Sequence, residues 1–138
     1  MFRTERIAEG VRLHSLTTSK FKTITNKVYV QTALGENTAM TALLPMVMSR
    51  GSAKFPTMQA IASHLANLYG ARFGCDVAKI GERHCMEFYY EMASNSYVGN
   101  DLQLFDEGIA TLVQLICHPR MEGNGFYPEY VQQEKMNL

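Results

Sequence analysis

The chain has 138 residues, of which 46% are hydrophobic, and its 13 basic residues balance 13 acidic ones to give a net charge of +0. This length suits one domain, and a balanced charge gives no electrostatic reason to expect nucleic acid or an acidic membrane as a partner. No apolar run approaches the ~20 residues that span a membrane, and the N-terminus lacks the apolar core of a signal peptide. The composition therefore predicts a cytoplasmic protein.

The first third of the chain predicts strands. Residues 1–9 are expected either to add an edge segment or to be loose. Residues 10–17 and, over a longer stretch, residues 23–34 alternate in polarity as strands do, and the polar residues 18–22 between them predict a turn. One face of the longer strand carries Val28, Val30, Thr32 and Leu34, and the other carries Lys27, Tyr29, Gln31 and Ala33.

Residues 37–52 predict a helix with an unusual proline. Asn37 or Thr38 can cap its first turn, and Gly51 can end it. Pro45 removes a backbone hydrogen bond and clashes with the preceding turn, at a cost of about 3 kcal/mol. The helix is therefore expected to kink there or to be held by packing. The helical spacing i, i+3, i+4, i+7 predicts one buried face made of Met40, Leu43, Leu44 and Val47.

The remaining elements alternate hairpins with helices. Thr57 is expected to cap a helix over residues 57–69 that Gly70 stops, and residues 71–80 and 83–93 predict a hairpin. Residues 94–100 and 121–127 read as loops on either side of an amphipathic helix over 101–117, and a last helix starts at Pro128. The buried face of the first of these helices is predicted as Met58, Ile61, Leu65 and Leu68, and that of the amphipathic helix as Leu102, Phe105, Ile109, Leu112, Val113 and Ile116.

This order of elements predicts an α+β fold. Because the strands come as hairpins, we expect a two-layer domain with a largely antiparallel sheet and helices packed on one face. In the second hairpin strand, Met86, Phe88 and Tyr90 should face one way. The opposite face should carry Cys85, Glu87, Tyr89 and Glu91.

Candidate chemical groups are scattered. The four histidines, His14, His64, His84 and His118, show no i, i+3 or i+4 pair, and adjacent His84 and Cys85 must point to opposite faces of a strand. Three cysteines without C-x-x-C spacing predict buried, reduced thiols. Glu87 and Glu91 are expected to belong to a polar sheet face or to pair with lysines, and Glu134 is expected to be a solvated helix residue.

Residues 42–52 carry a resemblance to a known family. Anchored on Gly51-Ser52, this stretch resembles the zinc-site helix of the pitrilysin/insulinase metallopeptidases, which include the mitochondrial processing peptidase subunits. Weaker similarities follow in the family's order at residues 68–71, 116–119 and 133–135. The sequence Ala-Leu-Leu-Pro at residues 42–45 is most similar to a bacterial subgroup described as non-catalytic partners of an active paralogue.

The resemblance implies a fold without the family's chemistry. It implies a LuxS/MPP-like metallohydrolase fold, with residues 1–138 forming a single domain that is the N-terminal part of a larger one, truncated in its last helix. The two histidines and the catalytic glutamate of the H-x-x-E-H motif fall on Ala42, Met46 and Pro45, and the third zinc ligand falls beyond Leu138. No catalytic residue, zinc ion or other cofactor is therefore expected.

Three functions remain open at this point. The first is a catalytically deficient peptidase homologue that pairs with an active paralogue or with itself, or that binds an extended peptide as an added strand. The second is an active zinc endopeptidase with an unorthodox site. The third is a plain interaction or scaffold domain.

Overall fold

The computed structural model describes residues 1–99 and 103–138 of the chain. The N-terminal half contains β1 (Arg3–Ala8), β2 (Val11–Ser15), β3 (Thr23–Ala33), α1 (Thr38–Met48) and α2 (Met58–Asn67). The second half contains β4 (Arg72–Ile80), β5 (Arg83–Ala93), α3 (Asn95–Val98), α4 (Leu104–Cys117), β6 (Met121–Glu122), β7 (Gly125–Phe126) and α5 (Pro128–Asn137).

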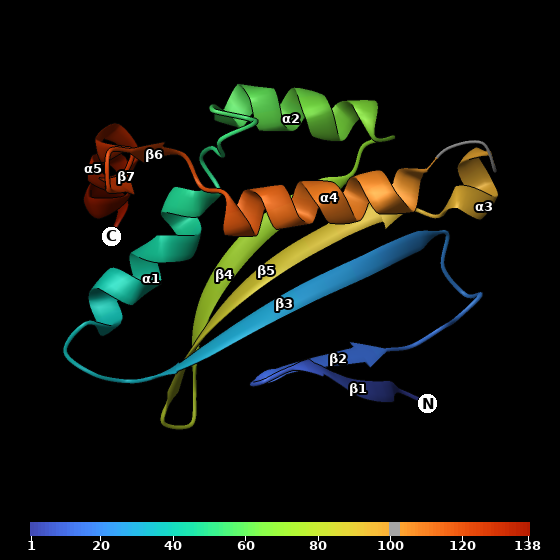
Figure 1. Ribbon diagram of the computed structural model, residues 1–138, viewed down its shortest axis with the longest axis horizontal. Coiled ribbons are helices and arrows are strands. Elements are labelled where there is room, and N and C mark those ends of the chain that lie inside the picture. The colour runs from blue at the N-terminus through green and yellow to red at the C-terminus, as the bar shows by residue number, and fades with distance from the viewer. Residues whose placement is uncertain (100–102) are drawn as a thin grey trace.

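The central sheet has three antiparallel strands in the order β3-β5-β4, as Figure 1 shows. Strand β5 pairs with β3 along its whole length, from Thr23 opposite Ala93 to Ala33 opposite Arg83, and with β4 on its other side. The predicted hairpin between β4 and β5 is confirmed, and Gly81 adopts a φ of 60° in its turn. In β5 the even-numbered residues from 84 to 92 are all buried, so the predicted alternation is confirmed, although Cys85 on the other face is buried as well.

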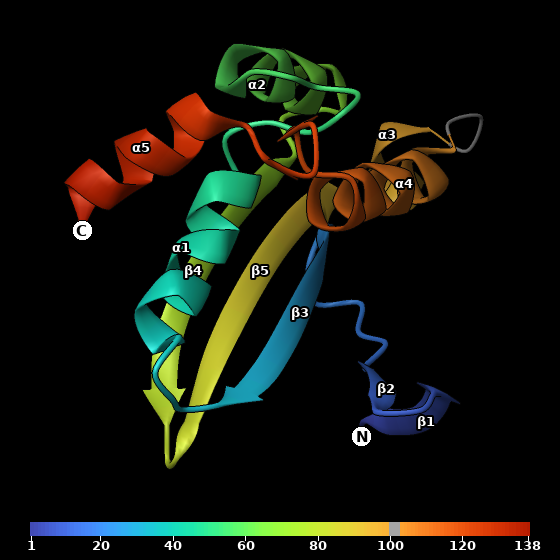
Figure 2. The ribbon, with the colours of Figure 1, turned by 60° about the vertical axis from the view of Figure 1, so that its left-hand side comes forward.

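The helices pack on one face of this sheet, which makes the domain the predicted two-layer α+β fold (Figures 1 and 2). Helix α1 lies against β4 and β5, and α4 lies against β5. The principal core cluster joins side chains from α2, β5 and α4 with the turn after α2. Its buried members are Ile61, Leu65, Leu68, Ala71, Tyr90, Met92, Leu104, Leu112 and Leu115.

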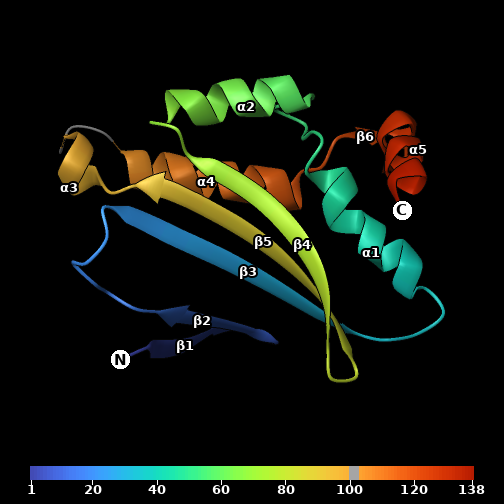
Figure 3. The ribbon, with the colours of Figure 1, turned by 180° about the vertical axis from the view of Figure 1, so that it is seen from behind.

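Strands β1 and β2 form a separate hairpin. Within residues 1–99 and 103–138 they pair only with each other, and all of their residues are exposed. Figures 1 and 3 place this hairpin beyond the outer edge of β3, with β2 between β3 and β1. Residues 1–9 therefore supply an edge strand, and the strand predicted in residues 10–17 is confirmed.

The buried face of α4 matches the prediction only in part: Leu112 is buried and Ile109 and Ile116 pack against the core, as predicted. Phe105 and Val113 are 43% and 46% exposed, while the buried residues are Leu104, Gly108, Thr111, Leu112 and Leu115. Gly108 explains the rotation, because a Cβ at this position would meet Met92 and would lie 3.3 Å from Cε1 of Tyr90. The helix therefore approaches β5 most closely where it has no side chain. Leu102, the remaining residue of the predicted face, lies outside the described residues.

Three more predictions about the elements are corrected. Met40 and Met58 are 69% and 57% exposed, so neither belongs to the buried face of its helix. The stretches predicted as loops contain the short helix α3 and the small β6–β7 hairpin. Helix α1 ends at Met48, and Gly51 instead allows a close approach, because a Cβ there would lie 2.5 Å from the carbonyl oxygen of Pro56.

The ends of the other helices follow the sequence. Thr57 caps α2 by accepting a hydrogen bond from the amide of Ala60 at 3.1 Å, and Pro128 opens α5. Tyr69 and Gly70 both have positive φ, at 58° and 73°, where the chain leaves α2. In the part of the chain that the structure describes, no helix is long and apolar enough to cross a membrane.

Candidate functional site

Helix α1 carries the positions at which the resemblance would place metal chemistry. Pro45 is fully buried, and the helix continues through it to Met48. The Pro45 carbonyl accepts a hydrogen bond from the amide of Ser49 at 3.0 Å and one from the thiol of Cys75 at 3.3 Å. The proline is therefore held by packing, which is one of the two outcomes that the sequence predicts.

The two flanking positions offer no imidazole. Ala42 has no ligand atom, and Met46 presents a thioether whose sulfur lies 3.8 Å from Sγ of Cys75 on β4. Burial raises the pKa of the Cys75 thiol, while a hydrogen bond to Ser49 acts in the opposite direction. A neutral thiol is a poor nucleophile and a poor metal ligand, so this pair of sulfur atoms behaves as packing between α1 and β4.

The histidines do not gather at this helix. His14 bonds Thr4 within the β1–β2 hairpin through Nδ1 at 2.9 Å, and His118 is an exposed C-cap of α4. His84 is buried on the helix-facing side of β5, and its ring nitrogens contact no hydrogen-bonding partner among residues 1–99 and 103–138. The same residues contain no cluster of three or more His, Cys, Asp or Glu side chains that could hold a metal ion.

His64 lies in the α2–α4 interface. Its Nε2 is 2.9 Å from the hydroxyl of Thr111, and its ring stacks on Phe55 with centroids 4.3 Å apart. Burial lowers the pKa of His64, and the nearby charge of Lys54 adds to the effect. His64 is therefore a half-buried histidine with a hydrogen-bonding partner on the neighbouring helix.

Glu134 is not the solvated residue that the sequence predicts. Its carboxylate pairs with Arg50, just after α1, and the two side chains are only 13% and 21% exposed. Arg50 also donates a hydrogen bond from Nη1 to Oε1 of Gln133 at 2.9 Å. These bonds hold α5 against α1, so Glu134 has a structural partner at the end of the candidate site. A local pattern gives no sign of this pairing, because 84 positions separate the two residues.

The polar face of the sheet carries the remaining acidic candidates. Glu87 accepts a hydrogen bond from Nζ of Lys27 on the neighbouring strand at 2.7 Å, which raises the pKa of Lys27. A hydrogen bond to Glu91 raises the pKa of Tyr89 in the same way. The expectation that this carboxylate pairs with a lysine is confirmed for Glu87.

The cysteines are all free, but Cys117 is exposed, so the prediction of buried thiols is wrong for that residue.

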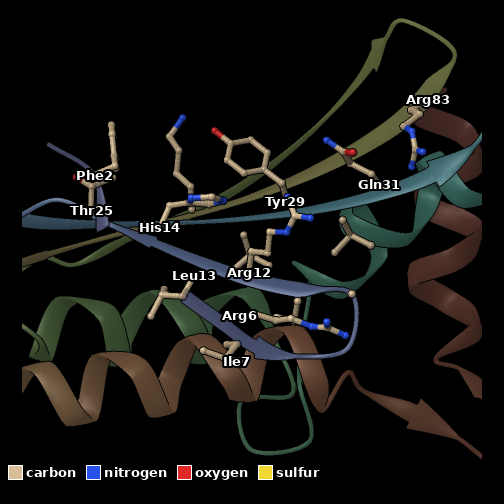
Figure 4. Close-up of a pocket in the computed structure, with 15 residues that line it drawn as sticks. Phe2, Arg6, Ile7, Arg12, Leu13, His14, Thr25, Tyr29, Gln31 and Arg83 are labelled. Atoms are coloured by element: carbon tan, nitrogen blue, oxygen red, sulfur yellow. The ribbon is translucent and has the colours of Figure 1, made fainter. Parts of the chain in front are cut away.

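A hollow of about 1340 Å³ lies between the β1–β2 hairpin and the outer edge of β3. Figure 4 shows Thr25, Tyr29 and Gln31 along one side of this groove, and Arg12 and Leu13 along the other. Sequence patterns could not locate the groove, because its two walls are separate strands joined by a seven-residue segment whose path the pattern does not specify.

Comparison with known proteins adds two similarities. The chain is 34% identical over 130 residues to the protein of Bacillus subtilis (strain 168) named "Probable inactive metalloprotease YmfF", matching 94% of this chain and 30% of that protein. It is 31% identical, with a TM-score of 0.93, to a crystal structure of a conserved protein from Enterococcus faecalis V583, matching 99% of this chain and 32% of that one. The chain thus spans about a third of the length of each of these relatives.

These comparisons correct one expectation. No model of a protein family matches the chain, and the relative's name states only a probable inactive metalloprotease. The assignment to the pitrilysin/insulinase family, with its bacterial subgroup, is therefore not supported and is withdrawn. The motif resemblance at residues 42–52 was too degenerate to carry it, because none of the three chemically defining side chains of that motif is present.

Proposed function

We propose that this chain is a catalytically deficient, metallopeptidase-like domain that functions by binding. It either pairs with an active peptidase or binds an extended peptide. The observation that carries the proposal is the state of α1, where Pro45 is fully buried and its carbonyl is bonded to Ser49 and Cys75. Similarity to a protein named as a probable inactive metalloprotease supports the same reading.

Helix α1 lacks the side chains that zinc-dependent catalysis needs. A catalytic zinc needs three protein ligands and an open position, and hydrolysis needs a base beside the metal-bound water. Ala42 and Pro45 supply neither a ligand nor a base, and the thioether of Met46 is a weak zinc ligand beside imidazole. At these three positions helix α1 therefore offers packing side chains and no group suited to zinc-dependent hydrolysis.

The first test measures metal and hydrolysis together. Purified chain, dialysed against zinc and then against buffer, is assayed for zinc by elemental analysis and for cleavage of unstructured fluorogenic peptides. We expect far less than one equivalent of zinc and no cleavage that a chelator abolishes. One tightly held equivalent with chelator-sensitive proteolysis would contradict the proposal and favour an active enzyme with an unorthodox site.

The second test addresses pairing. The chain is added to an active zinc peptidase encoded in the same genome, and complex formation is followed by sedimentation while kcat/KM is measured for a peptide substrate. We expect a complex in which the kinetic constants change. If no complex forms with the peptidase, and unstructured peptides also fail to bind, the chain is a scaffold domain and the proposal is wrong.

A further inference from the structure

The β6–β7 hairpin carries an asparagine that is followed by a glycine. Asn124 and Gly125 form this pair, and each of the other asparagines precedes a residue that has a side chain. The side-chain amide of an asparagine can be attacked by the backbone nitrogen of the next residue, and a glycine hinders this approach least because it has no Cβ. The pair is therefore the place in this sequence where such a reaction meets the least steric resistance.

The surroundings of this pair leave room for the reaction. Asn124 and Gly125 are both exposed, and a Cβ at Gly125 would meet no atom within 4 Å. The positive φ of the turn, 61°, belongs to Gly123, so the backbone conformation does not require a glycine at position 125. An alanine at position 125 is therefore compatible with the folded chain, which provides a control for the chemistry.

The hairpin is short enough to open locally. Strands β6 and β7 have two residues each, and Met121, Glu122 and Gly125 are exposed. Their pairing places Glu122 opposite Gly125 and Met121 opposite Phe126. Few buried contacts oppose the fraying of such a segment, so the side chain of Asn124 can turn toward the Gly125 nitrogen while the core stays folded.

We propose that Asn124 is a site of spontaneous deamidation. The Gly125 nitrogen gives its proton to solvent and bonds to Cγ of Asn124, while the bond from Cγ to the side-chain nitrogen breaks and ammonia leaves with a proton returned by solvent. Water then opens the cyclic succinimide. Attack at Cγ gives aspartate, and attack at the main-chain carbonyl carbon gives isoaspartate, in which the backbone runs through the side chain. Water is the only co-reactant, so the reaction requires no partner molecule.

The modified turn no longer fits the hairpin. Isoaspartate adds a carbon atom to the main chain between the paired residues Glu122 and Gly125. A two-residue hairpin turn has a fixed geometry, so it cannot absorb the additional atom while both strands keep their register. Either product also places a carboxylate near that of Glu122, and the two negative charges repel each other.

The hairpin holds the start of α5, and Figure 1 shows the two side by side. The amide of Tyr127 donates a hydrogen bond to the carbonyl of Arg120 at 3.1 Å, and Cζ of Arg120 lies 3.7 Å from the centroid of the Tyr127 ring. Arg120 also donates from Nη1 to the Pro56 carbonyl at 2.9 Å and to the Tyr130 hydroxyl at 3.0 Å. Isoaspartate at position 124 should therefore loosen the attachment of α5.

The first experiment follows the reaction in the folded chain. The full chain is incubated at neutral and at alkaline pH, and peptide mapping by mass spectrometry measures aspartate and isoaspartate at every asparagine. Asn124 should react well before Asn37, which is exposed but precedes a threonine. Its rate should rise with pH, because the attacking nitrogen must lose a proton. Modification of Asn124 in urea but not in the folded chain would overturn the proposal.

A matched variant tests the route through the succinimide. Gly125→Ala should slow the modification of Asn124 at least about tenfold, because a Cβ on the attacking residue crowds its approach to Cγ. The same substitution meets open space in the folded chain, and a urea melt verifies that the variant is folded. Equal rates in the variant and the unchanged chain would overturn the proposed route.

The second experiment measures the consequence for α5. The isoaspartyl form is separated by chromatography and compared with the unchanged chain and with Asn124→Asp, which has the added charge but not the additional main-chain atom. Amides of Tyr127 and Tyr130 should exchange hydrogen faster in the isoaspartyl form, whereas those of β5 should not change. Equal exchange in the isoaspartyl form and in either comparison protein would overturn the proposed effect of the altered backbone.

Discussion

At the scale of single residues, burial decides which polar side chains have structural roles. Glu134 and Glu87 both accept a hydrogen bond from a cation on another element, but Glu134 and Arg50 are mostly buried whereas Glu87 and Lys27 are more open to solvent. Solvent and salt screen the exposed pair, and its contribution to stability is correspondingly small. The two pairs therefore form a matched comparison within one domain.

We predict that Glu134→Gln destabilises the fold by about 1–3 kcal/mol, because it leaves the partly buried Arg50 without a charged acceptor. Glu87→Gln, the control, should leave the urea midpoint almost unchanged. Both are measured as midpoints at constant slope. Equal shifts in the two variants would show that the contact between α1 and α5 does not depend on this ion pair.

His64 should make stability depend on pH. Burial lowers its pKa in the folded state below the ordinary value of 6.5, so the unfolded chain takes up the proton first as pH falls. The contribution of His64 is therefore fully present above pH 6.5 and is lost as pH falls through its folded pKa. Urea midpoints of His64→Gln should fall less between neutral and mildly acidic pH than those of a His118→Gln control. Parallel curves for the two variants would rule out this role.

At the scale of elements, α1 shows how tertiary packing preserves a helix that its sequence disfavours. Pro45 costs the helix a backbone bond, yet its ring is fully buried and its carbonyl is bonded to Ser49 and Cys75. The favourable terms come from contacts with β4, β5 and α5, and they are absent in an isolated peptide of the same sequence. Packing against the sheet thus compensates for a poor local propensity.

We predict that Pro45→Ala is neutral or destabilising. Alanine restores an amide that can bond Thr41, but it removes buried ring carbons worth about 0.8 kcal/mol for each CH₂. It also raises the conformational entropy of the unfolded chain, which lowers the free energy of unfolding by about 0.4–1 kcal/mol. A urea melt compares the variant with the unchanged chain. A clear rise in the midpoint at constant slope would mean that the proline is only a burden on the helix.

At the scale of the whole molecule, stability is concentrated in the three-stranded sheet and its helices. Strand β5 is paired on both sides and carries two of the fully buried side chains, Tyr90 and Met92. The β1–β2 hairpin has no buried residue and contributes no member to the core cluster. The two parts should therefore open independently.

Native-state hydrogen exchange should reveal this division. We expect the slowest amides in β5 and the fastest strand amides in β1 and β2, since local opening of the hairpin exposes little apolar surface. Amides of β3 that bond β5 should be slow, whereas those on its outer edge should exchange early. Protection of the free hairpin as strong as that of β5 would show that the hairpin is already part of the cooperative core.

Local patterns were sufficient where the residues that determine a feature lie within a few positions of one another. The alternation in β5, the turn at Gly81, the cap at Thr57 and the start of α5 at Pro128 all depend on residues within a few positions of one another. The sequence therefore predicted the class of fold, the antiparallel hairpin and most element boundaries.

Only the tertiary structure determined the features that depend on residues far apart in the sequence. In helix α4, the close approach to β5 at Gly108 buries Leu104 and Leu115 and leaves Phe105 and Val113 exposed. The partner of Glu134 and the groove between β2 and β3 likewise depend on segments that only folding brings together. Periodicity specifies that a helix or strand has an apolar face, but the shape of the neighbouring element determines which face is buried, because close packing tolerates few gaps.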